Sequence, residues 1–141
     1  MEDSLISVLE NQSSHKFQGR HMMASLIGCS SAALLNVDGL LENLSAAATA
    51  AGATVLDTRH HLFPNGGITA VLLLSESHAS IHTYPENSAC FVDLFTCGTS
   101  VDQSKFNQVL SSYLKPTQIN QNTFNRGLTA ELVEFAASIS E

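Results

Sequence analysis

The chain has no tryptophan, only three prolines and only three cysteines among its 141 residues. Aromatic side chains make up 6% of the sequence and charged ones 13%, whereas 44% of it is hydrophobic. No pair of cysteines has the Cys-x-x-Cys spacing of a zinc or redox site, and the odd count suits a reducing compartment. We therefore expect a buried hydrophobic core to hold one domain together, with the cytoplasm as the default compartment.

Positive charge is also scarce, because six lysines and arginines stand against thirteen aspartates and glutamates, for a net charge of −7. The basic residues are scattered along the chain, whereas binding to nucleic-acid phosphates requires a cluster of them. No apolar run is long enough to cross a bilayer, and residues 1–19 do not have the pattern of a secretory signal. We expect neither nucleic acid nor a membrane as partner, and the acidic balance favours a cationic small molecule.

Hydrophobic periodicity predicts both strands and helices. The expected strands are residues 20–27, 53–59, 68–74, 78–84 and 89–96, with an edge strand at 117–124. The expected helices are residues 38–51, 101–115 and 130–139, and residues 1–18 are expected to form a flexible N-terminal arm. Short turns favour antiparallel pairing. The prediction is an α+β fold in which helices pack on one face of an antiparallel sheet, a two-layer sandwich. Its uncovered side favours a homodimer.

The densest set of reactive side chains is the run Ser-Glu-Ser-His-Ala-Ser-Ile-His-Thr-Tyr-Pro-Glu at residues 75–86, directly after an apolar strand. The Ser77 hydroxyl is adjacent to the Glu76 carbonyl, so its attack would convert the amide to an ester. Elimination and hydrolysis would then leave a pyruvoyl group at residue 77. This chemistry needs a base and an oxyanion donor. His82 could supply the base if it folds back toward Ser77, and Thr69 a hydroxyl if the two strands pair.

The same run does not have the pattern of two other common sites. His78 and His82 are four residues apart, but they lie on an expected strand, and the helical metalloprotease pattern His-Glu-x-x-His is absent. Ser77 also lacks the Gly-x-Ser-x-Gly turn of the serine hydrolases. We therefore expect no metal site here.

From about residue 19 to residue 127 the sequence resembles the short-chain, pyruvoyl-dependent S-adenosylmethionine decarboxylase proenzymes of bacteria and archaea. The motifs that carry the resemblance are Gly19-Arg20-His21, Gly52-Ala53-Thr54, the run at residues 75–86 and Asp93-Leu94-Phe95-Thr96-Cys97-Gly98. The resemblance implies self-cleavage between Glu76 and Ser77. The products would be a β chain of residues 1–76 and an α chain of residues 77–141, and the decarboxylase domain would span residues 19–141.

The resemblance also implies roles for single residues. Ser77 would become the covalent pyruvoyl cofactor, whose carbonyl forms a Schiff base with the substrate amine and accepts electrons as carbon dioxide leaves. His82 would act in processing, as would Thr69, which stands where the family usually has a serine. Cys97 would be the proton donor in decarboxylation. No other organic cofactor is implied.

Two further positions match substrate-binding residues of the family. Phe63 would place an aromatic ring against the adenine, and Glu86 would meet the ribose hydroxyls or the sulfonium. Two positions depart from the family pattern: Ser25 replaces an acidic residue, and Ala79 replaces a larger aliphatic residue that would form part of the pocket wall.

The leading prediction is decarboxylation of S-adenosyl-L-methionine to S-adenosylmethioninamine, the aminopropyl donor of spermidine synthesis. The two departures keep open a pyruvoyl-dependent decarboxylase of arginine or ornithine on the same fold. Two other classes are a non-catalytic homologue and a plain small-molecule binding module. The intact set of Thr69, Ser77, His82 and Cys97 argues against the homologue, and only charge supports the binding module.

Overall fold

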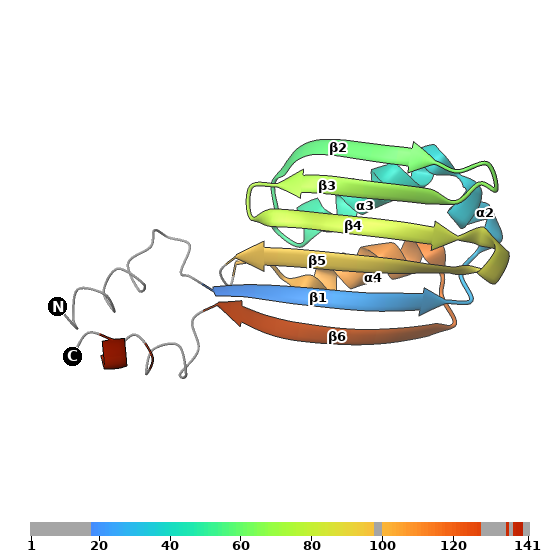
Figure 1. Ribbon diagram of the computed structural model, residues 1–141. Coiled ribbons are helices and arrows are strands. Elements are labelled where there is room, and N and C mark those ends of the chain that lie inside the picture. The colour runs from blue at the N-terminus through green and yellow to red at the C-terminus, as the bar shows by residue number, and fades with distance from the viewer. Residues whose placement is uncertain (1–17, 98–99, 128–134, 136, 140–141) are drawn as a thin grey trace.

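A computed structural model describes residues 18–97, 100–127, 135 and 137–139, and the statements below concern these residues. They form a single six-stranded antiparallel sheet in the order β2-β3-β4-β5-β1-β6 (Figure 1). The strands are β1 (Gln18–Ile27), β2 (Val55–Leu62), β3 (Ile68–Leu74), β4 (Ser77–Tyr84), β5 (Ala89–Cys97) and β6 (Gln118–Gly127). The helices are α2 (Ser31–Leu35), α3 (Val37–Ala50) and α4 (Gln103–Leu114), with a short 3-10 helix, η1 (Pro85–Asn87).

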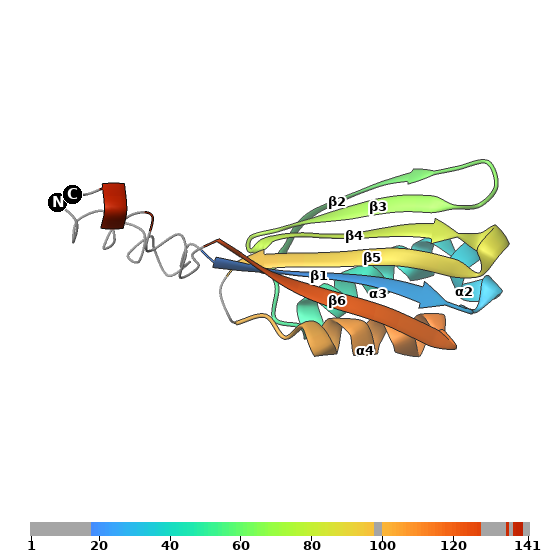
Figure 2. The same cartoon turned by 60° about the horizontal axis from the view of Figure 1, so that its bottom comes forward.

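All three α-helices lie on the same side of the sheet (Figure 2). Burial alternates along β3, β4 and β5, because every second side chain points toward the helices. The largest fully buried side chains come from both layers: Met22, Leu72, Ile81 and Leu94 from the strands, and Leu44, Phe106 and Leu110 from the helices. This two-layer arrangement confirms the predicted fold class.

Helix α3 shows why the local prediction succeeded. Leu40, Leu44 and Ala47 recur at helical spacing and are buried against the sheet. The Asn36 side chain caps the first turn by accepting a hydrogen bond from the Gly39 amide at 3.0 Å. The helix ends before Gly52, whose φ of +96° suits glycine.

The structure differs from the sequence prediction in places. Helix α2 was not predicted, because its five residues are too few to show a period. Strand β1 begins two residues earlier than expected, at Gln18. Strand β6 is confirmed as an edge strand, and it is exposed along its whole length. The arm predicted for residues 1–18 lies outside the described residues except for Gln18, and so does most of the helix predicted at 130–139.

The face of the sheet without helices, here called the open face, is turned toward the reader in Figure 1. It carries large apolar side chains that are between 39% and 54% exposed: Met23, Val71, Leu73, Tyr84, Phe91 and Phe124. An apolar surface of this kind usually marks an interaction site. Among the described residues, no helix is long and apolar enough to cross a membrane.

Candidate active site

Ser77, the predicted cleavage residue, stands at the start of β4, where a two-residue connection joins it to β3. Its backbone pairs with Leu74 of β3 and with Thr96 of β5. Its φ is +155°, in the range that residues other than glycine rarely adopt. Such a conformation costs on the order of 1–3 kcal/mol and is characteristic of functional sites. The predicted scissile junction is therefore strained in the intact chain.

The carbonyl of Glu76, which the Ser77 hydroxyl would attack, is held by a neighbouring strand. The Cys97 amide donates a hydrogen bond to this oxygen, with an N–O distance of 3.0 Å. The Glu76 carboxylate in turn accepts a hydrogen bond from the Thr54 amide at 2.9 Å. A backbone donor on the attacked carbonyl would stabilise the negative charge that develops there. Sequence reasoning missed this donor, since it proposed only a side-chain hydroxyl for the task.

The Cys97 thiol is at the same end of the sheet, because Cys97 follows the Thr96 that pairs with Ser77. Its side chain is half-buried and makes no disulfide. Cys29 and Cys90 are buried, and that burial raises the pKa of both thiols. Of the three cysteines, Cys97 is therefore the one accessible enough to exchange a proton with a ligand.

His82 and Thr69 lie elsewhere on the open face. Strands β3 and β4 pair these two residues, and their Nδ1 and Oγ1 atoms are 3.1 Å apart. However, β4 runs on without turning back, so His82 lies five residues beyond Ser77, about 16 Å at 3.3 Å per residue. The structure thus brings His82 to Thr69, but it does not fold His82 back to Ser77 within one chain.

Phe63 and Glu86 lie at the far end of β4 from Ser77. Together with Thr69 and Tyr84 they line a largely apolar cavity of about 460 Å³. The Glu86 carboxylate accepts a hydrogen bond from the Asn65 amide group at 3.2 Å. The candidate residues therefore fall into two groups. We call Glu76, Ser77 and Cys97 the Ser77 group, and Phe63, Thr69, His82 and Glu86 the Phe63 group.

A network that sequence reasoning missed lies between the two groups. The Asp93 carboxylate is 2.7 Å from His21 Nε2 and 3.1 Å from His78 Nε2, and it accepts a hydrogen bond from the Ser80 hydroxyl. Burial opposes ionisation of Asp93, but the hydrogen bonds from Ser80, His21 and His78 outweigh it and lower the pKa of the carboxyl. No local pattern could join His21 to Asp93, because 72 residues separate them.

Two imidazoles and one carboxylate within 4.8 Å of one another have the composition of a metal site. The tautomer of His21 argues against that use. Arg126 Nη1 lies 3.4 Å from His21 Nδ1, and a guanidinium can only donate. The Nδ1 atom therefore accepts, which leaves the proton on Nε2, where it is donated to Asp93. A metal would need the lone pair of that Nε2 atom.

The two departures from the family pattern lie in different surroundings. Ser25 lines a cavity of about 480 Å³ on the open face, together with Ser80, His82 and Phe91. Ala79 is fully buried on the helix-covered face. Its replacement of a larger residue therefore concerns core packing, and the expectation that it forms part of a pocket wall was wrong.

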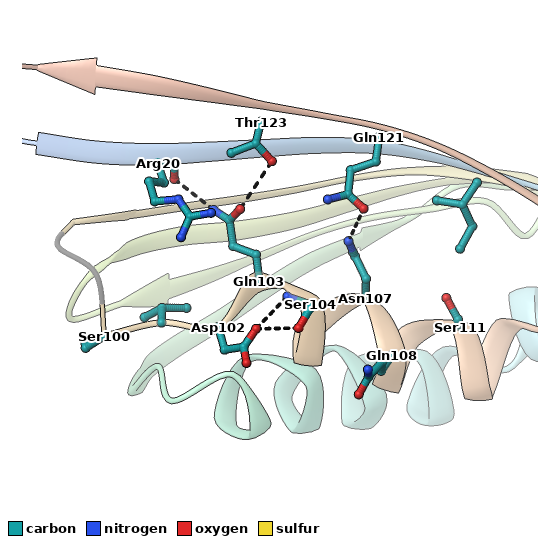
Figure 3. A pocket seen from close by; sticks show the side chains of 12 residues that line it. Arg20, Ser100, Asp102, Gln103, Ser104, Asn107, Gln108, Ser111, Gln121 and Thr123 are labelled. Carbon is teal, nitrogen blue, oxygen red and sulfur yellow. Dashed lines mark hydrogen bonds between the residues drawn. The ribbon is translucent and has the colours of Figure 1, made fainter. Parts of the chain in front are cut away.

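A cavity of about 700 Å³ lies on the other side of the sheet, between α4 and β6 (Figure 3). Its polar side chains are hydrogen-bonded: Gln103 donates to the backbone carbonyl of Arg20 in β1 at 3.3 Å and accepts from the Thr123 hydroxyl of β6 at 3.4 Å, and Asn107 donates to Gln121 of β6 at 2.7 Å. None of the candidate site residues lines it. The contacts with Thr123 and Gln121 hold the edge strand β6 against α4.

The fold and the Ser77 group together define a class of enzyme that the comparisons identify. A solved adenosylmethionine decarboxylase from Aquifex aeolicus has the same fold, with a TM-score of 0.74 and 31% identity over 82% of this chain and 95% of that one. A family model described as S-adenosylmethionine decarboxylase matches residues 20–127. The chain belongs to the S-adenosylmethionine decarboxylase family.

Curated relatives agree with this assignment. An S-adenosylmethionine decarboxylase proenzyme from Thermosipho melanesiensis is 37% identical over 117 residues, which is 83% of this chain and 90% of the relative. One from Methanococcus aeolicus is 36% identical over 116 residues, covering 82% of this chain and 99% of the relative. The resemblance inferred from the motifs is thereby confirmed.

Proposed function

We propose that the protein cuts itself between Glu76 and Ser77 and then decarboxylates S-adenosyl-L-methionine to S-adenosylmethioninamine, the aminopropyl donor for spermidine. The observation that carries this proposal is the hydrogen bond from the Cys97 amide to the Glu76 carbonyl at the strained Ser77 junction. The proenzyme names of the relatives support self-processing and favour S-adenosylmethionine over arginine or ornithine.

Processing begins with the residues of the intact chain. The Ser77 oxygen bonds to the Glu76 carbonyl carbon, the amide bond breaks, and the amide nitrogen takes a proton. Removal of the Ser77 α-proton then breaks the Cβ–Oγ bond and releases residues 1–76 with a Glu76 carboxylate. The dehydroalanine left at residue 77 takes up water and loses ammonia, which yields the pyruvoyl group. The strain at Ser77 and the Cys97 amide favour the first of these steps.

We further propose that the base comes from a second copy of the chain. His82 lies too far along β4 to reach Ser77 of its own chain. The open face presents an apolar surface suited to a second copy. Consider two copies whose open faces lie against each other, related by a two-fold axis midway between the sheets. The axis runs perpendicular to the strands and passes over β4 near Ser80. Such an axis exchanges the two ends of β4 and sets the Phe63 group of one protomer opposite the Ser77 group of its partner.

For turnover, the carbonyl formed from Ser77 would supply an acceptor for the electrons released as carbon dioxide leaves. The chain's own residues would do the rest. Phe63 would stack on the adenine, and Glu86, anchored by Asn65, would bind the ribose hydroxyls or the sulfonium. The Cys97 thiol would return a proton to the carbon that lost the carboxylate. The three free cysteines suit a reducing compartment, and we place the enzyme in the cytoplasm.

The test is the denatured intact mass of the purified protein beside a Ser77→Ala variant. We expect two fragments, residues 1–76 and 77–141, the second lacking the mass of an unmodified serine terminus, and a single uncut chain in the variant. Release of carbon dioxide from S-adenosylmethionine, arginine and ornithine then identifies the substrate. A wild-type chain that stays whole after prolonged incubation would rule out the pyruvoyl enzyme. Turnover of arginine alone would show that the substrate is a basic amino acid and not S-adenosylmethionine.

A further inference from the structure

The network at Asp93 has no part in the reaction described so far, yet it holds the residue next to the cleavage site. His78 directly follows Ser77, and its Nε2 atom lies 3.1 Å from the Asp93 carboxylate on the neighbouring strand β5. Asp93 is itself fixed by His21 of β1 at 2.7 Å and by the Ser80 hydroxyl. The Asp93 carboxylate therefore joins three strands, and one of its partners, His78, is the residue directly after Ser77.

The groups around this carboxylate favour a fixed geometry. The His21 and His78 rings meet edge to face, with centroids 5.8 Å apart, and Phe95 packs against both. Arg126 lies over the Phe95 ring, with its guanidinium carbon 4.4 Å from the ring centroid. The side chains of His21 and Asp93 are only 18% and 21% exposed. Hydrogen bonds to a half-buried carboxylate are stronger than those between neutral groups.

Self-cleavage changes what holds residue 77 in place. In the intact chain Ser77 is tied on one side to Glu76, which is bound by the Cys97 and Thr54 amides. After the cut that tie is gone, and residue 77, still paired with Leu74 and Thr96, is the first residue of a new chain. Chain ends are poorly ordered unless something fixes them. The next residue along, His78, is the first whose side chain is tied to a neighbouring strand.

We propose that Asp93, through His78, is a positioning device that fixes the new end of the α chain for turnover. This inference rests on the proposed function, because the chain end exists only if the chain is cut. If Asp93 acts in this way, self-cleavage and decarboxylation depend on different contacts. Cleavage uses Ser77 while Glu76 still holds it, so cleavage does not depend on the His78 hydrogen bond. Decarboxylation uses residue 77 after that support is lost, so turnover depends on it.

The test compares two substitutions of His78 that differ in reach. In His78→Gln the side-chain amide nitrogen takes nearly the place of Nε2 and can still donate to Asp93. In His78→Asn the side chain is polar but too short to reach. A third variant, His60→Gln, changes an exposed histidine of β2 and serves as the control. Intact mass follows cleavage, steady-state kinetics with S-adenosylmethionine follow turnover, and thermal melting follows the fold.

We expect all variants to be cut completely. In His78→Asn kcat should fall about 10- to 100-fold while KM stays within about threefold of wild type, since a misplacement of about 1 Å can cost two orders of magnitude in rate. His78→Gln should recover kcat to within about threefold of wild type, the span expected of a retained hydrogen bond in altered geometry.

Several results would overturn the inference. They are an unchanged kcat in His78→Asn, equal losses in the Asn and Gln variants, a change confined to KM, or an Asn variant that folds but is not cut. An uncut wild-type chain is a different outcome, because it rules out both the proposed function and the positioning role of Asp93 and His78.

Discussion

The most informative prediction concerns which chain supplies His82. A His82→Ala chain keeps Ser77 but has lost the imidazole, and a Ser77→Ala chain keeps the imidazole but cannot be cut. Each variant alone should stay whole. If His82 acts on the Ser77 of its partner, a dimer made of one chain of each kind contains one complete processing site. In that site the Ser77→Ala chain provides the imidazole and the His82→Ala chain is cut.

The size of the effect follows from the geometry. Five residues of extended strand separate Ser77 from His82, about 16 Å, which no imidazole can bridge. Co-expression at equal levels gives roughly half mixed dimers, each with one complete and one empty site, by the symmetry of a two-fold interface. We therefore expect roughly half of the His82→Ala chains to be cut when cleavage reaches completion.

The assay is intact mass after co-expression with a distinguishable tag on each chain. The control replaces the His82→Ala chain by His60→Ala, which should be cut with or without a partner variant. A His82→Ala chain that stays whole in mixed dimers, while the control is cut, would refute the shared site. Cutting of the His82→Ala chain on its own would refute any need for that histidine.

Three other predictions test separate parts of the molecule. Cys97→Ala keeps the backbone amide that binds the Glu76 carbonyl, so it should still be cut, whereas kcat should fall at least about 100-fold; normal turnover would exclude the thiol as proton donor. In the uncut Ser77→Ala background, Phe106→Ala should lower the free energy of unfolding in urea by about 3–5 kcal/mol, because Phe106 is fully buried; a loss below about 1 kcal/mol would contradict that packing. The pKa of Asp93 is lowered by folding, so its carboxylate stabilises the fold above the ordinary aspartate pKa of about 4, and this contribution is lost as pH falls through the lower folded value. The stability difference between this background and its Asp93→Asn derivative should therefore shrink as pH falls below about 4, and a difference that stays constant there would contradict the ionised network.

Much of the fold could be predicted because single segments carry their own pattern. The apolar stripe of α3 is local, as are the short strand segments β3, β4 and β5, and the sequence predicts all four elements. The position of β1 was not predictable in this way. It lies between β5 and β6, far from its neighbours in sequence, and its ladders with both are set by tertiary packing. Strand β6 is exposed throughout and offers almost no periodicity, so its identification depended on a single isoleucine among polar residues.

The candidate residues of the site could be selected one by one from the sequence, but their arrangement in space could not. Ser77, His82 and Cys97 were selected from their chemistry and the resemblance to the family. The expectation that His82 would fold back to Ser77 treated neighbours in sequence as neighbours in space, which an extended strand does not permit. The Cys97 amide and the Asp93 network depend on pairing between distant strands, and no spacing rule reveals that pairing.

The cut proposed between Glu76 and Ser77 has a consequence for how the protein is made. The Glu76–Ser77 bond lies in the tight connection of a β-hairpin whose strands pair from Thr69 with His82 to Leu74 with Ser77. While that connection is whole, the two strands meet by closing a short loop, which is fast and depends little on concentration. Once it is cut, the sheet consists of two molecules, and a denatured sample can rebuild it only by association. Unfolding of the processed protein should therefore be hard to reverse on dilution, whereas the Ser77→Ala chain should refold. Under the proposed function, the peptide bond at Ser77 is needed only once, to join the two strands while the sheet assembles.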